Sequence, residues 1–153
     1  MGAALPDLPM PQTVMIRLLR IAIAGMTEYF DPVLRRIGLS ENMFHVLCLL
    51  VASENGQASP SELSELVGTS RANMTRILEQ LEREGYASRE IEARDGRRHL
   101  IQITDAGRQA TRDAVPQMIE PLHRAFSDLT PDEFATLDRL LRKVTLSFDK
   151  GAI

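Results

Sequence analysis

The sequence predicts a mainly α-helical fold with a small β-hairpin wing, in which a winged helix-turn-helix region lies between two helical ends. Two observations lead to this prediction. A polar helix begins after Ser70 and ends near Gly85, and two short segments rich in alternating apolar residues, 87–92 and 99–104, follow it directly. An Asp-Gly pair between these segments is typical of a hairpin turn. Because an isolated hairpin is only marginally stable in water, this one should pack against neighbouring helices.

The first helical pattern spans residues 13–30 and carries a broad apolar face. That face consists of Val14, Met15, Leu18, Leu19, Ile21, Ala22 and Met26. Pro32 should kink or restart this helix, since proline removes a backbone donor, and Gly38 should end it. Ser40 is the expected N-cap of a second helix, which should end near Gly56.

The next two helices have the spacing of a helix-turn-helix. The run Ser59-Pro60-Ser61-Glu62 predicts a capping box with proline at the first helical position, and Gly68 should end this short helix. Ser70 should then cap a second helix after a turn of only three residues. The buried stripe of the helix that follows Ser70 is expected to be Met74, Ile77, Leu78 and Leu81.

Two long helices are expected after the hairpin. The first should begin at Thr104 or Asp105 and continue to Phe126, with interruptions at Pro116 and Pro121. A second capping box, Thr130-Pro131-Asp132-Glu133, should open the last helix. The apolar face of that helix consists of Phe134, Leu137, Leu140, Leu141, Val144 and Phe148.

The expected organisation is a DNA-binding region in the middle of the chain and a dimerisation region built from both ends. The central region is residues 40–104, and the dimerisation region is residues 12–38 together with 105–149. The central helices can cover their own apolar faces, whereas the terminal helices cannot. Long exposed apolar faces favour aggregation, so a two-fold homodimer is the simplest arrangement that covers them.

Charge and composition permit nucleic-acid binding without requiring it. The 153 residues carry a formal net charge of −3, but residues 69–112 hold nine arginines against seven acidic side chains. A single cysteine excludes an intramolecular disulfide and suits a reducing, cytoplasmic compartment. No apolar run is long enough to span a membrane. The proline-rich start, residues 1–11, lacks the basic segment of a signal peptide.

Two groups of residues are candidates for DNA contact. Arg71 and Asn73 occupy the first turn of the predicted recognition helix, where side chains usually reach base edges. Ser70, at the N-terminus of that helix, suits a backbone phosphate. The complete set of candidates on this helix is Ser70, Arg71, Asn73, Thr75 and Arg76, and the candidates at the hairpin tip are Arg94, Asp95, Arg97 and Arg98. The alternative is an ordinary solvated surface, which the helix and the hairpin together make less favourable.

The spacing of several short motifs resembles that of the MarR family of transcriptional regulators, over about residues 13–148. The motifs are Gly68-x-Ser70-Arg-Ala-Asn-x-Thr75-Arg76, Leu81-Glu82-x-x-Gly85-Tyr86, Asp95-x-Arg97 and Ile103-Thr104-x-x-Gly107. The resemblance implies a homodimer that binds a pseudo-palindromic operator in double-stranded DNA, most often as a repressor. It also implies that Asp95 orients Arg97 by an ion pair and that Arg97 enters the minor groove. Many members of the family respond to small aromatic or lipophilic acids.

Other functions are less well supported by the residues. A winged-helix protein–protein adaptor stays open as an alternative, as does a thiol-based redox sensor that uses Cys48. The apolar neighbours of Cys48 favour a core thiol, because burial raises a thiol pKa. The three histidines lack the spacing of metal ligands, and the sequence contains neither a catalytic arrangement nor a cofactor-binding motif. An enzyme is therefore not expected.

Overall fold

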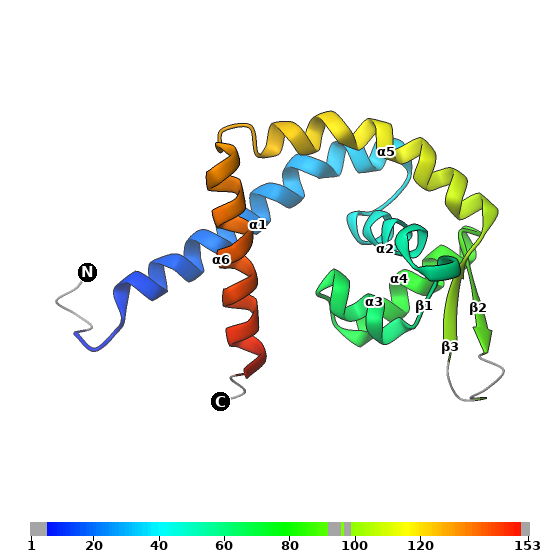
Figure 1. Ribbon diagram of the computed structural model, residues 1–153, viewed down its shortest axis with the longest axis horizontal. Coiled ribbons are helices and arrows are strands. Elements are labelled where there is room, and N and C mark those ends of the chain that lie inside the picture. The colour runs from blue at the N-terminus through cyan, green and yellow to red at the C-terminus, as the bar shows by residue number, and fades with distance from the viewer. Residues whose placement is uncertain (1–5, 92–95, 97–98, 151–153) are drawn as a thin grey trace. The chain divides into compact units, whose positions relative to one another are not determined.

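The computed structural model describes residues 6–91, 96 and 99–150 (Figure 1). The chain forms two compact units, Met1–Gln117 and Met118–Ile153. None of the helices in the described ranges combines the length and the apolar character that crossing a membrane requires. The mainly α-helical fold with a small β-sheet confirms the fold class expected from the sequence.

Helix α1 spans Met10–Ile37, so it begins earlier than the pattern predicted. Pro32 lies inside this helix, and the expected restart at Pro32 is wrong. Proline removes only one intrahelical hydrogen bond, and the buried side chains of Phe30 and Leu34 hold the helix in the core on both sides of it. Gly38 ends α1, with its amide donating to the Arg35 carbonyl at 3.1 Å.

Helix α2, Glu41–Ala52, begins as predicted, because the Met43 amide donates to Ser40 Oγ at 3.2 Å. It ends before the expected position, and a 3₁₀ turn, η1 (Glu54–Gly56), follows it. Five side chains of α2 are buried and form the centre of the core: Met43, Phe44, Val46, Leu47 and Leu50. Helices α3 (Pro60–Val67) and α4 (Arg71–Arg83) then pack against α2.

The sheet has three antiparallel strands in the order β1-β3-β2. Strands β2 (Ala87–Ile91) and β3 (His99–Ile103) confirm the predicted hairpin, with Ala87 opposite Ile103 and Ile91 opposite His99. Strand β1 (Gln57–Ala58) was not predicted, because two residues are too few to show alternation. It pairs with β3 and so attaches the wing directly to the segment before α3.

Helix α5 spans Asp105–Ala125 without a break, so the interruptions expected at Pro116 and Pro121 are wrong. The carbonyls that lose their usual donors belong to Arg112 and Gln117, which are exposed, so water can satisfy them. Within the second unit, Phe126 stacks edge-to-face on Phe134 at 5.2 Å between ring centroids, across the turn to α6 (Pro131–Lys150).

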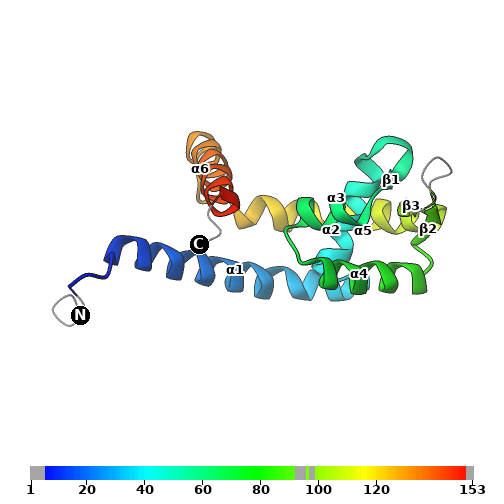
Figure 2. The ribbon, with the colours of Figure 1, turned by 90° about the horizontal axis from the view of Figure 1, so that it is seen from below.

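The second predicted capping box is confirmed at the start of α6. The Glu133 amide donates to Thr130 Oγ1 at 3.2 Å, and the Thr130 amide donates to Glu133 Oε2 at 2.9 Å. The N-terminal half of α1 extends away from the helix-turn-helix in both views (Figures 1 and 2). Most of its apolar side chains are exposed in the single chain, as are many of those on α6.

Candidate nucleic-acid interface

The helix-turn-helix is fixed by two well-formed helix caps. Ser59 and Glu62 form the predicted capping box, with the Ser59 amide donating to Glu62 Oε2 at 2.8 Å and the Glu62 amide donating to Ser59 Oγ at 3.3 Å. Gly68 ends α3 with a φ of 74°, a conformation that a residue with a side chain adopts only with strain. Ser70 caps α4 by accepting from the Asn73 amide at 3.1 Å. The short turn therefore sets α4 at a defined angle to α3.

Helix α4 has one buried face and one exposed polar face. Met74, Ile77, Leu78 and Leu81 are all buried, as the sequence predicted. Ser70, Arg71, Thr75 and Arg76 are exposed. Burial of the apolar stripe prevents α4 from rotating about its axis, so the polar face has a fixed direction. An exposed helix with hydroxyl and guanidinium groups on one face has the chemistry required for DNA contact.

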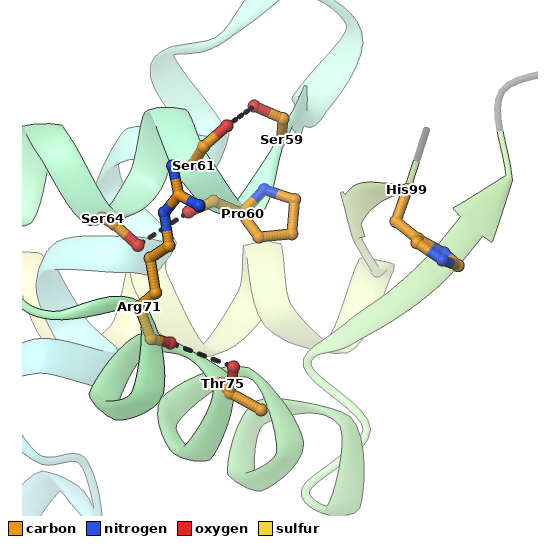
Figure 3. Close-up of a pocket in the computed structure, with 7 residues that line it drawn as sticks. All are labelled: Ser59, Pro60, Ser61, Ser64, Arg71, Thr75 and His99. Atoms are coloured by element: carbon orange, nitrogen blue, oxygen red, sulfur yellow. Dashed lines mark hydrogen bonds between the residues drawn. The ribbon is translucent and has the colours of Figure 1, made fainter. Parts of the chain in front are cut away.

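Arg71 lies at the edge of a groove of about 450 Å³ between α3, α4 and β3. Figure 3 shows its side chain extending from α4 toward α3, where Ser61 and Ser64 lie, while His99 belongs to β3. In the described part of the chain, no carboxylate forms a salt bridge with Arg71. The Arg71 guanidinium can therefore bind a backbone phosphate or the acceptor atoms of a base edge, while the Ser61 hydroxyl is held by Ser59 Oγ at 3.3 Å.

Asn73 is less available than its neighbours on α4. Its side chain is half-buried, and its Nδ2 donates to Thr69 Oγ1 at 2.7 Å. Asn73 therefore connects the first turn of α4 to the turn that precedes it. Reading an adenine takes Oδ1 and one N–H of the Asn73 amide. The bond to Thr69 uses the other N–H and restricts how the amide can turn toward a base.

The wing is attached to the rest of the interface through its strands. Arg89 Nε on β2 forms an ion pair with Glu82 Oε1 on α4 at 3.2 Å, and Gln57 Nε2 on β1 donates to Glu90 Oε2 at 3.3 Å. The four candidate residues at the tip, Arg94, Asp95, Arg97 and Arg98, lie outside the described residues. The expected ion pair between Asp95 and Arg97 therefore stays a prediction.

Sequence reasoning missed several residues that line or support this interface: Ser61, Ser64, Glu82, Arg89 and His99. The alternation in β2 could have placed Arg89 and Ile91 on one face, but not the contact with α4. The serines gave no signal, because their position depends on the angle between α3 and α4.

The remaining candidates do not form a reactive or metal-binding site. Cys48 is half-buried on α2, and burial raises the pKa of its thiol, which disfavours the reactive thiolate. Among the described residues, no group of three or more histidine, cysteine or acidic side chains is arranged to hold a metal ion.

Comparison with known proteins identifies the family. A model of the MarR family matches residues 39–99, the segment that contains the helix-turn-helix and most of the hairpin. The transcriptional repressor MprA of Escherichia coli (strain K12) is 31% identical over 144 residues, which cover 94% of this chain and 82% of MprA. The chain belongs to the MarR family. It is accordingly a member of a family of DNA-binding transcriptional regulators and not of enzymes.

Solved structures of MarR-family regulators share this fold. Sco3205 of Streptomyces coelicolor, solved in complex with DNA, has a TM-score of 0.82 and 24% identity, with 90% of this chain and 88% of that chain covered. BpsR of Bordetella bronchiseptica has a TM-score of 0.77 and 25% identity, with 84% and 91% covered, and its structure concerns regulation of DNA binding by 6-hydroxynicotinic acid.

Proposed function

We propose that this MarR-family chain is a homodimeric repressor that binds a pseudo-palindromic operator and is released by a small aromatic or lipophilic ligand. The observation that carries the proposal is the exposed polar face of α4. It presents Arg71, Thr75 and Arg76 from a helix whose opposite face is completely buried. Such a helix can enter a major groove, while the wing reaches the neighbouring backbone or minor groove.

The roles within the interface divide by position. Ser70, at the helix N-terminus, suits a phosphate, whereas Arg71 and Asn73 are nearest to base edges. Thr75 and Arg76 lie one turn further along α4. At the wing tip, Arg94, Arg97 and Arg98 supply positive charge, and Asp95 is proposed to orient Arg97.

The homodimer is supported by apolar side chains that the single chain leaves exposed. On α6, seven large apolar residues are between 36% and 63% exposed: Phe134, Leu137, Leu140, Leu141, Val144, Leu146 and Phe148. On α1, Leu18, Ile21 and Ile23 are more than half exposed. Monomeric proteins rarely leave such surfaces in water. We therefore assign residues 12–38 and 105–149 to dimerisation and residues 40–104 to DNA binding.

A ligand site is supported by a groove of about 530 Å³ between α1 and α2, a volume that suits a small aromatic molecule. Met26 and Leu34 on α1 give it an apolar wall, and Asp31 and Glu41 lie at its polar side. A ligand there would contact both the proposed dimerisation helix and the DNA-binding region. The Asp31 carboxylate is paired with Arg35 at 2.8 Å, so it is the Glu41 carboxylate that makes a neutral or positively charged ligand a better fit in this groove than an acid.

The proposed function is tested by the salt dependence of DNA binding. The probe is an inverted repeat enriched from a randomised duplex pool by the wild-type protein. Arg97→Ala should weaken binding to every duplex and lower the slope of log K against log salt by about one unit. Arg112→Ala, at an exposed arginine on α5, is the matched control and should leave the slope unchanged.

The Asp95→Ala variant distinguishes two roles of Asp95: orientation of the Arg97 side chain, and repulsion of DNA by its negative charge. If Asp95 orients Arg97, its removal weakens DNA binding although it also removes a negative charge. Tighter binding by Asp95→Ala would contradict the proposed ion pair. A wild-type protein that enriches no duplex, and whose weak DNA binding does not change with salt, would instead favour the protein–protein adaptor.

A further inference from the structure

The end of the recognition helix and the start of α5 are joined by a single hydroxyl group. Thr104 Oγ1 donates to the Gly85 carbonyl at 2.6 Å and accepts from the Gly107 amide at 3.0 Å. The Thr104 amide also donates to the Tyr86 carbonyl at 3.1 Å. We call these four residues, Gly85, Tyr86, Thr104 and Gly107, the α4–α5 joint.

Two residues of the α4–α5 joint are also hydrogen-bonded to the last turn of α4. The Gly85 amide donates to the Glu82 carbonyl at 3.0 Å, and the Tyr86 amide donates to the Leu81 carbonyl at 2.9 Å. The Gly85–Tyr86 peptide group therefore takes part in both sets of bonds, because its amide donates to Leu81 and its carbonyl accepts from Thr104 Oγ1. Hydrogen bonds are directional, so this connection fixes an angle as well as a distance.

Close packing at Gly107 makes the joint rigid. A Cβ atom at this buried position would collide with the Tyr86 carbonyl oxygen and would lie 2.9 Å from Ile103 Cγ1. Only glycine lets the first turn of α5 approach the Tyr86 peptide this closely. The joint thus combines a steric contact with three hydrogen bonds.

The other connections of α4 hold it mainly relative to elements other than α5. Its apolar stripe packs against α2 and α3, which fixes the face of α4 that is buried and its orientation to those two helices. The ion pair between Glu82 and Arg89 is about one-third exposed on both sides, so solvent weakens it. The α4–α5 joint is therefore the connection best suited to control the angle between the recognition helix and α5.

We propose that Thr104 is a positioning residue that couples the direction of α4 to α5 and so sets the distance between the two recognition helices of the dimer. The inference rests on the proposed function, because the distance matters only when two recognition helices bind one operator. Half-sites on DNA repeat with the helical turn, so a one-base-pair change in spacing both separates and rotates them. A rigid joint should therefore make binding sensitive to half-site spacing.

The experiment compares four variants on three duplexes. The duplexes are the inverted repeat enriched by the wild-type protein and versions with one base pair added or removed at its centre. Thr104→Val removes both hydroxyl hydrogen bonds, and Thr104→Asp can still cap the Gly107 amide but cannot donate to Gly85. Thr104→Ser restores the hydroxyl, and Thr111→Val is the matched control, because the Thr111 hydroxyl donates to the Gly107 carbonyl inside α5.

Wild type, Thr104→Ser and Thr111→Val should each prefer the original spacing by about tenfold or more, and Thr104→Val and Thr104→Asp should reduce that preference to about threefold or less. If Thr104 has a purely structural role, Thr104→Val and Thr104→Asp should lower the melting temperature and leave the preference for the original half-site spacing unchanged. That result would overturn the proposal, as would failure of both Thr104→Val and Thr104→Asp to fold. If the wild-type protein enriches no inverted repeat, it is the proposed function that fails.

Discussion

The central region and the terminal helices use similar apolar residues in opposite ways. Leu47, Leu50 and Leu81 in the centre are fully buried within one chain, whereas Leu137, Leu140 and Leu141 on α6 are 36% to 44% exposed. Hydrophobic periodicity alone does not distinguish these two groups. The difference indicates that the central region completes its core alone and that the terminal helices need another surface.

This contrast also gives the two regions different roles in the proposed function. The complete core holds α4 in one orientation, so its polar face has a fixed direction. Recognition of a DNA sequence requires such a fixed direction. In the proposed dimer, the incomplete terminal surfaces would bind the second copy and so bring in the second α4. Under that proposal, base recognition belongs to the central region and association of the two copies to the terminal helices.

The largest expected effect comes from disrupting the terminal surface. Leu137→Asp combined with Leu141→Asp should convert the dimer to a monomer, because it would bury two charges in an apolar interface. Operator affinity should then fall by about 100-fold or more, since binding at two linked half-sites is lost. Light scattering and DNA titration measure the two effects.

The control for this double variant is Leu66→Asp, at an apolar residue of α3 that is 68% exposed. It should leave the molecular mass of the dimer unchanged. A double variant that remains dimeric would show that the interface does not involve this face of α6.

A second experiment applies the same substitution in each region. Leu78→Ala, in the buried stripe of α4, should lower the free energy of unfolding by about 2–5 kcal/mol. Leu140→Ala, at a residue 44% exposed in the single chain, should weaken dimerisation instead. Its drop in melting temperature should shrink as protein concentration rises, whereas that of Leu78→Ala should not. Equal concentration dependence for the two variants would remove the contrast between the regions.

The sequence predicted the elements of the central region well because their signals are local. Ser40, Ser59 and Ser70 each cap the helix that the sequence assigned to them, and the buried stripe of α4 is confirmed. Such features depend on side-chain contacts three or four residues apart. The three-residue spacing of a capping box can therefore be seen without knowing the fold.

The sequence failed where neighbours in space decide the outcome. Pro32, Pro116 and Pro121 all lie inside continuous helices, because packing and hydration compensate for single missing hydrogen bonds. Strand β1 forms only because β3 lies beside it. The contact of Arg89 with α4 likewise depends on the fold, which is why the pattern of charges did not reveal it.

The third experiment concerns how α4 reads sequence. Asn73→Ala should cost about 1–3 kcal/mol on the enriched operator and much less on a scrambled duplex, if Asn73 contacts a base. Because Asn73 also donates to Thr69, Thr69→Val is the matched control: it removes that acceptor but leaves the Asn73 amide. Ser70→Ala should weaken binding to both duplexes equally and cost about 1 kcal/mol of folding stability through the lost cap.

Competition titrations against operator and scrambled DNA separate these outcomes. An unchanged operator-to-scrambled ratio for Asn73→Ala would contradict base reading by this residue. If Asn73→Ala and Thr69→Val weaken DNA binding equally, Asn73 contributes by stabilising the turn before α4 and not by contacting a base.

The smallest effect is expected at Cys48, which tests whether the central region is as inert as its packing suggests. Burial raises the thiol pKa above its ordinary value, so at any pH near neutrality the thiolate fraction is lower than that of a free thiol. Alkylation by iodoacetamide should therefore be slower than for a peptide thiol, and the rise of its rate with pH should be displaced toward higher pH. The protein unfolded in urea should react at the peptide rate.

Cys48→Ser should bind the enriched operator with the affinity of the wild-type protein, to within about twofold, and peroxide should not release wild-type protein from DNA. Faster alkylation than the peptide, together with release by peroxide that Cys48→Ser resists, would make the thiol a sensor. In that case α2, which belongs to the central region, would be a responsive part of the chain, and response would not be confined to the terminal helices.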